Sequence, residues 1–169
     1  QVQQAVAEVI RDRLVREYPD WFTRDALPHD VAALAMLVQE DLAVMSGNRL
    51  ALLHVCFPSG WSPREKIGKS FADFHEPVPH MQEINAREQD YVDQMIGATS
   101  GLVRFVWGVQ IGDRLDGHPG QPREPFDPAR SKVCLRVERQ TIMGLKQVGA
   151  CLFTIRLYLY DACDVERVS

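Results

Sequence analysis

The sequence has no apolar stretch near the roughly 20 residues that a membrane-spanning helix needs, and no signal-peptide pattern at its start. It has no excess of basic residues either, since 19 Lys and Arg face 23 Asp and Glu for a net charge of −4. This balance argues against a nucleic-acid-binding protein, which needs a basic face. Both common Gly-rich phosphate loops are absent, as is the Gly-x-Ser-x-Gly motif, so neither nucleotide binding nor serine hydrolase chemistry at Ser59 has support.

Paired cysteines are also missing. The four cysteines, Cys56, Cys134, Cys151 and Cys163, are scattered without C-x-x-C spacing. A zinc cluster is therefore disfavoured, and a set of reduced thiols in a cytoplasmic protein is the better interpretation. Because the chain starts at Gln1 and its first residues already have helical spacing, we expect a fragment or a trimmed chain.

The composition is that of an ordinary globular domain. The 169 residues are 46% hydrophobic and 25% charged, enough for one sizeable core. Hydrophobic periodicity predicts a helix over 2–14 and a second from Asp30 as N-cap to 42. Short helices are expected over 63–74, and a longer one over 81–96.

Four strands are expected, over 50–57, 102–111, 133–139 and 150–160, with a long Gly- and Pro-rich loop over 112–131. The strand over 50–57 is apolar on both faces and should be central. This order predicts an α+β fold, with an antiparallel sheet, helices packed on one of its faces and an N-terminal helical extension. We expect a helical segment over 1–45, a sheet domain over 46–162 and a tail over 163–169.

One of the five histidines stands out by its surroundings. None belongs to an H-E-x-x-H or similar metal-ligand spacing. His75, however, follows Phe71 and Phe74 and precedes Pro77 and Pro79, which stop a helix from continuing. An apolar pocket with one fixed imidazole is what axial ligation of haem requires.

A charged pair lies on one of the expected strands. Arg136 and Glu138 project from the same strand face and have two interpretations: a solvated cross-strand charge pair, or the floor of a pocket. In a pocket, Arg136 could bind an anionic group and Glu138 could accept a proton or bind an amine. Arg104 and Arg156 hold similar positions on neighbouring strands, so we expect several arginines on one sheet face.

Several strings in this sequence together resemble one family. They are His54-Val55-Cys56-Phe57-Pro58-Ser59-Gly60-Trp61, Glu65-Lys66-Ile67-Gly68-Lys69-Ser70, His75-Glu76-Pro77-Val78-Pro79, 103–108, Arg136-Val137-Glu138-Arg139-Gln140-Thr141 and 150–160. In this order, and over about 37–160, the chain resembles the haem-dependent oxidative N-demethylases.

The resemblance implies a PAS-like (Per-ARNT-Sim) fold, b-type haem, and oxidation of a small methylated amine such as dimethylamine by O₂ with release of formaldehyde. It implies NADPH as electron source, through flavin and iron–sulfur cofactors on partner subunits. Carried over by motif, His75 is the expected axial iron ligand. Glu138, Arg136 and Arg104 are the expected catalytic groups, and Arg136, Arg104 and Arg156 the expected haem-binding arginines.

Two other functions stay open at this point. One is a non-catalytic PAS module that binds haem or another ligand and acts as a sensor. The other is a cofactor-free interaction domain, because residues 142–146 lack the second Arg and the Leu-Pro expected of the family. A carboxylate on the same face as Arg136 favours the enzyme, since a gas sensor needs no proton-transfer group there.

Overall fold

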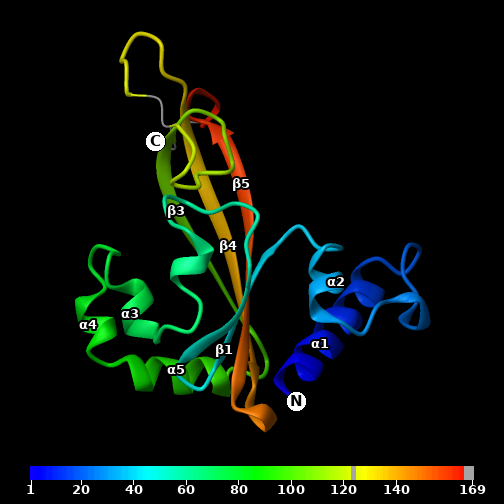
Figure 1. Ribbon diagram of the computed structural model, residues 1–169. Coiled ribbons are helices and arrows are strands. Elements are labelled where there is room, and N and C mark those ends of the chain that lie inside the picture. The colour runs from blue at the N-terminus through cyan, green and yellow to red at the C-terminus, as the bar shows by residue number, and fades with distance from the viewer. Residues whose placement is uncertain (123–124, 166–169) are drawn as a thin grey trace.

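The computed structural model describes residues 1–122 and 125–165, and a five-stranded antiparallel sheet is its centre (Figure 1). The strands lie in the order β2-β1-β5-β4-β3. Their bounds are β1 Asp41–Ser46, β2 Arg49–His54, β3 Leu102–Ile111, β4 Val133–Leu145 and β5 Ala150–Asp161. The mixed α+β class and the antiparallel sheet expected from the sequence are confirmed.

Helices cover both faces of this sheet. The chain begins with α1 Val2–Glu17 and α2 Val31–Ala35, which lie on one face; α3 Phe71–His75, α4 Gln82–Asn85 and α5 Glu88–Gly97 lie on the other (Figure 1). Asp30 caps α2 as expected, since its carboxylate accepts a hydrogen bond from the Ala33 N–H at 3.0 Å. None of the described helices is long and apolar enough to cross a membrane.

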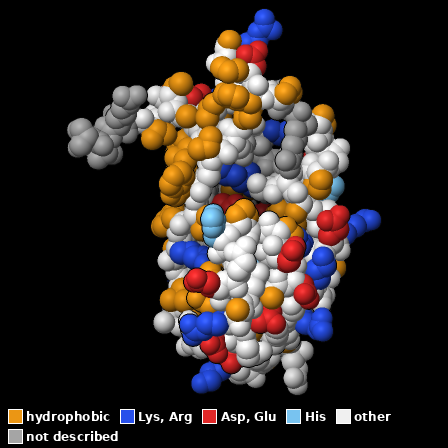
Figure 2. All heavy atoms as spheres, turned by 90° about the vertical axis from the view of Figure 1, so that its left-hand side faces the viewer, with side chains coloured by type: hydrophobic (Ala, Val, Ile, Leu, Met, Phe, Trp, Pro, Cys, Tyr) orange, Lys and Arg blue, Asp and Glu red, His pale blue; other side chains and the backbone are white. Residues whose placement is uncertain are grey.

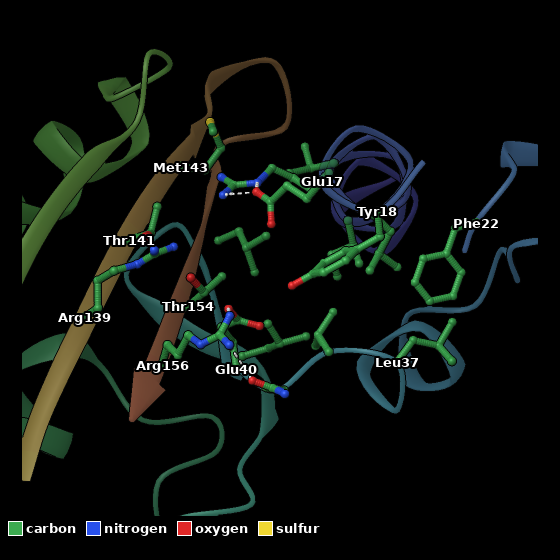
Figure 3. Close-up of a pocket in the computed structure, with 18 of the residues that line it drawn as sticks. Glu17, Tyr18, Phe22, Leu37, Glu40, Arg139, Thr141, Met143, Thr154 and Arg156 are labelled. Atoms are coloured by element: carbon green, nitrogen blue, oxygen red, sulfur yellow. Dashed lines mark hydrogen bonds and ion pairs between the residues drawn. The ribbon is translucent and has the colours of Figure 1, made fainter. Parts of the chain in front are cut away.

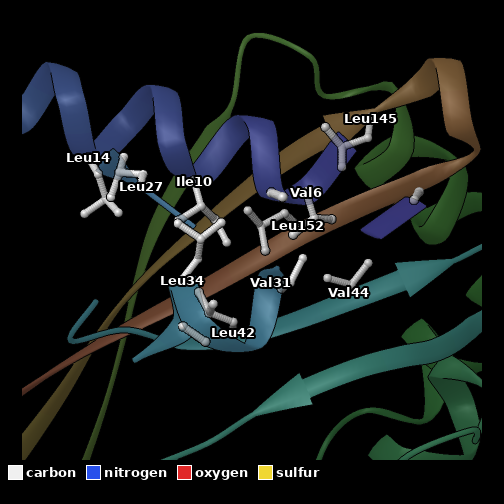
Figure 4. Close-up of a cluster of buried hydrophobic side chains, with 13 residues drawn as sticks. Val6, Ile10, Leu14, Leu27, Val31, Leu34, Leu42, Val44, Leu145 and Leu152 are labelled. Atoms are coloured by element: carbon white, nitrogen blue, oxygen red, sulfur yellow. The ribbon is translucent and has the colours of Figure 1, made fainter. Parts of the chain in front are cut away.

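The larger core lies between the N-terminal helices and the sheet (Figure 4). One side of α1 supplies Val6, Ile10 and Leu14, because these positions recur at helical spacing. They pack against Leu42 and Leu152 of the sheet. This packing fixes α1 over β1 and β5 and leaves the outer part of β3 uncovered.

A second core lies under α3–α5. Phe71 and Val92 pack against Met45, Ile142 and Cys151 of the sheet. The end of α5 approaches β4 closely at Gly144, whose N–H donates to the Ala98 carbonyl at 2.9 Å. This core holds the short helices over the half of the sheet that carries the candidate site.

The outer edge of the sheet is unusually apolar. On β3, alternate side chains point away from the α3–α5 face, and four of them are 61–71% exposed: Val103, Phe105, Trp107 and Val109. Edge strands are normally protected by charges, prolines or bulges. The only charged residue within β3 is Arg104.

Four expectations for the elements were wrong. The strand over 50–57 was expected to be central, but it is β2, which lies at the edge of the sheet and ends at His54. The expected helix from Asp30 to 42 ends at Ala35, and β1 occupies its last residues, because a short run that is apolar on both faces fits helix and strand alike. The expected helix over 81–96 is divided into α4 and α5. The strand expected over 133–139 continues to Leu145.

The faces of β2 also differ from simple alternation. The register shifts where β1 pairs with β2, so that Val44 lies opposite Leu52 and Met45 lies opposite Leu50. Ala51 is the extra residue of a β-bulge. As a result Leu50 packs in the second core and Leu52 against the first, although regular alternation along a strand would place both on one face.

Candidate functional site

His75 is the last residue of α3, and a capping box fixes that short helix. The Ser70 hydroxyl accepts from the Asp73 N–H at 3.2 Å, and the Asp73 carboxylate accepts from the Ser70 N–H at 3.4 Å. The His75 Nδ1–H donates to the Phe71 carbonyl at 2.9 Å. A carbonyl can only accept, so the proton of the neutral ring is on Nδ1 and the lone pair is on Nε2.

The surroundings of His75 keep the imidazole neutral. The rings of Phe71 and Phe74 each lie 4.3 Å from the imidazole, centroid to centroid. Burial lowers the pKa of His75 to about 4; the positive charges of Lys66 and Arg104 add to this, and the bond to Phe71 opposes it. A neutral imidazole whose orientation is fixed through Nδ1 is the form that ligates metals.

Opposite α3, the sheet presents a chain of polar side chains. Arg104 Nε donates to Gln140 Oε1 at 2.6 Å, and Gln140 Nε2 donates to Glu138 Oε2 at 2.9 Å. Arg136 Nε lies 3.7 Å from Glu138 Oε1. Arg136, Glu138 and Gln140 are alternate residues of β4, so they share one face, and Arg104 is the direct cross-strand partner of Gln140. Figure 2 shows this side of the molecule, with a recess that has acidic and basic side chains at its base.

Arg136 also anchors two loops, the one after β2 and the one after β3. Its guanidinium donates to the carbonyls of Phe57 and Leu115, at 2.7 and 3.1 Å. The loop after β2 is also held by Asp41, whose carboxylate accepts from the Cys56 N–H at 2.7 Å. The buried Nε of Arg136 has no hydrogen-bond partner among the described residues, and it forms an ion pair with the Glu138 carboxylate at 3.7 Å.

The structure brings together four of the five predicted site residues. Arg104, Arg136 and Glu138 share the sheet face that α3 covers, and the charge of Arg104 acts on His75. The expectation that Arg156 shares this face is wrong. Arg156 is the cross-strand partner of Arg139, an odd-numbered residue of β4, and therefore points to the side of α1.

Sequence reasoning missed Gln140. This side chain is 7% exposed and connects Arg104 to Glu138. The signal was present, because Gln140 continues the i, i+2 alternation that places Arg136 and Glu138 on one face. The Phe57 carbonyl, in contrast, approaches Arg136 from 79 residues away along the chain, and no local pattern indicates that contact.

A comparison with protein families gives this arrangement a context. Residues 25–169 match the family described as haem-dependent oxidative N-demethylase, alpha subunit-like. The chain belongs to this family. The name implies haem as cofactor and a multi-subunit enzyme. The resemblance noted from the sequence motifs is thereby confirmed at the level of the family.

The residues of this N-demethylase family member suit haem. His75 offers one neutral nitrogen beside two aromatic rings, which matches single-histidine axial ligation. Over residues 1–122 and 125–165, no three His, Cys, Asp or Glu side chains gather as a multi-ligand metal site. The guanidinium of Arg104 suits the carboxylates of haem.

Proposed function

We propose that this chain binds haem b through His75 Nε2 and catalyses the oxidative N-demethylation of a small methylated amine, such as dimethylamine, with release of formaldehyde. Bound haem would supply the chemistry that uses O₂ to oxidise the N-methyl group. The observation that carries the proposal is the neutral His75, with its lone pair on Nε2 and its pKa lowered in part by the charge of Arg104, a residue of the sheet face that also carries Arg136 and Glu138.

We also propose that the fold is PAS-like. The strand order β2-β1-β5-β4-β3, with the short helices α3–α5 inserted between β2 and β3, supports this assignment. We expect the ligand to lie between the inserted helices and the sheet, with His75 on the helix side and Glu138 on the strand side.

The contacts of the three polar side chains indicate a different role for each. Arg104 also lies 5.9 Å from the Phe153 ring centroid, so its guanidinium is held close to the sheet, where it can bind a propionate. Glu138 is partly exposed and acidic, so it can hold a cationic amine or take up a proton. Gln140 holds both side chains in place through its amide.

Electrons would come from NADPH through flavin and iron–sulfur cofactors on partner subunits. The exposed apolar side chains of β3 support assembly with other subunits, because contiguous apolar surface of this kind is typical of interaction sites. A PAS sensor would also use His75, but it would have no need of Glu138.

The first experiment is an absorption spectrum of the protein purified with haem supplied. We expect a Soret band that is lost or shifted in His75→Ala and retained in His80→Asn. The control position is exposed, five residues away, and has a φ of 65° that Asn tolerates. Absence of a Soret band from the wild type would refute haem binding.

The second experiment separates an enzyme from a sensor. With dimethylamine, O₂ and a reductant, we expect formaldehyde from the wild type and at least about a hundredfold less from Glu138→Gln, the range in which a general acid–base group contributes. Haem-loaded protein that releases no formaldehyde would favour the sensor. Full turnover by Glu138→Gln would show that this carboxylate is not catalytic.

A further inference from the structure

A cavity of about 370 Å³ lies on the opposite face of the sheet from His75, between α1 and strands β1, β4 and β5 (Figure 3). Its volume is within the range of small-molecule sites. Much of its wall is hydrocarbon, including Ile10 and Leu14 of α1, Leu42 of β1 and Leu152 of β5. Arg139, Thr141 and Thr154 border it from the sheet, opposite Tyr18 and Phe22 (Figure 3).

The charges around this cavity do not balance. Arg139 and Arg156 are direct cross-strand partners on β4 and β5, a placement in which like charges repel. Arg156 is neutralised, because it lies 3.5 Å from Glu40 and donates to the Gln39 side-chain oxygen at 2.6 Å. Arg139 forms no ion pair with the described residues, and its buried Nε has no hydrogen-bond partner among them.

The other cation of the cavity is also neutralised. Arg13 lies 2.6 Å from Glu17, one helical turn further along α1. Three arginines therefore face two glutamates, and the surplus positive charge is at Arg139. A partly buried guanidinium without a counter-ion, beside two threonine hydroxyls and a hydrocarbon wall, matches a ligand with one anionic end and an apolar body.

We propose that this cavity binds an amphiphilic monocarboxylate, such as a medium-chain fatty acid, with its carboxylate on Arg139 and its hydrocarbon against α1 and β5. A chain of about eight to ten carbons suits a site of this size. The proposal is independent of haem binding, because β4 directs Arg139 and Glu138 to opposite faces of the sheet.

Calorimetric titration of the full chain with octanoate tests this site, with 1-octanol and octylammonium as ligands of equal length without a negative charge. We expect saturable octanoate binding and at least about tenfold weaker binding of the other two. Equal binding of octanol, or no octanoate binding, would overturn the proposal.

Variants identify the group that binds the carboxylate. Arg139→Gln should weaken octanoate binding at least about tenfold. Arg139→Lys should keep most of the affinity for octanoate because it keeps the positive charge. Arg13→Gln is the matched control: it changes an arginine of the same cavity that Glu17 already neutralises, so we expect less than about a threefold change. Folded Arg139→Gln protein with wild-type affinity would also overturn the proposal.

Discussion

Replacing Gly144 by alanine tests how the second core holds the site face together. A Cβ at this position of β4 would lie 2.3 Å from the Ile96 carbonyl oxygen and 2.8 Å from the Ala98 backbone nitrogen. Both are backbone atoms at the end of α5, so no side-chain rotation relieves the contact. Either α5 or β4 must move, and the hydrogen bond from Gly144 to Ala98 is lost or lengthened.

The expected loss of stability follows from these two effects, the steric overlap and the lost hydrogen bond. Overpacking of this kind destabilises by about 1–3 kcal/mol, and loss of the hydrogen bond adds about 1 kcal/mol. We therefore expect Gly144→Ala to lower the free energy of unfolding by about 2–4 kcal/mol. In a chain of this length, that corresponds to a decrease in Tm of about 10 °C.

Gly108→Ala is the matched control, because Gly108 lies on neighbouring β3 and a Cβ there would meet nothing within 4 Å. We expect a change within about 0.5 kcal/mol for this control. Urea and thermal unfolding of the two variants, measured beside the wild type, give the comparison. If the two alanine variants were equally stable, this result would refute the close approach of α5 to β4 at Gly144.

Three further predictions concern the thiols, pH and the cap of α3. Cys56 is exposed and should react with a thiol reagent in the folded protein. Burial raises the pKa of the Cys151 thiol to about 11, so this thiol should react only after unfolding. Early labelling of Cys151, detected by mass spectrometry, would contradict its burial. The neutral form of His75 is favoured by folding, so its stabilising contribution is complete above pH 6.5 and is lost as the pH falls toward 4. The difference between the two pKa values, 6.5 and about 4, corresponds to about 3 kcal/mol, which solvent at the partly exposed ring reduces to about 2 kcal/mol. Urea unfolding of the haem-free protein should show this loss, and His75→Asn should lack it; parallel pH profiles would refute the assignment. Ser70→Ala removes the N-cap of α3, so it should lower the free energy of unfolding by about 1 kcal/mol and weaken haem retention. Asp30→Ala removes the N-cap of α2 on the other face of the sheet, so it should lower the free energy of unfolding by about the same amount and leave haem retention unchanged.

The elements that the sequence predicts best are those with a one-sided pattern. The strand over 102–111 was predicted with its observed bounds, because its outward side chains alternate with the others along its length. β1 was missed for the opposite reason. Leu42 and Val44 pack in one core, and Met45 in the other, so the strand is apolar on both faces and has no periodicity to detect.

The candidate site was predictable in its parts but not in its connections. The spacing of Phe71, Phe74 and His75 indicated an imidazole among aromatic rings, and the structure places it so. The tautomer of His75 depends on a backbone carbonyl four residues earlier, which becomes visible only once α3 is formed. The anchoring of Arg136 depends on a long-range contact that the local sequence does not encode.

Residues 136–141 of β4 point alternately to the two faces of the sheet, and Arg156 lies on the face of Arg139, its cross-strand partner. Because side chains alternate along β4, Arg136, Glu138 and Gln140 face α3, whereas Arg139 and Thr141 face the cavity beside α1. The charged string therefore presents side chains to both faces of the sheet, and a shift of one residue in register would exchange the two sets. The close contact between Gly144 and the end of α5 opposes such a shift, so one register places Glu138 on the α3 side of the sheet and Arg139 at the cavity.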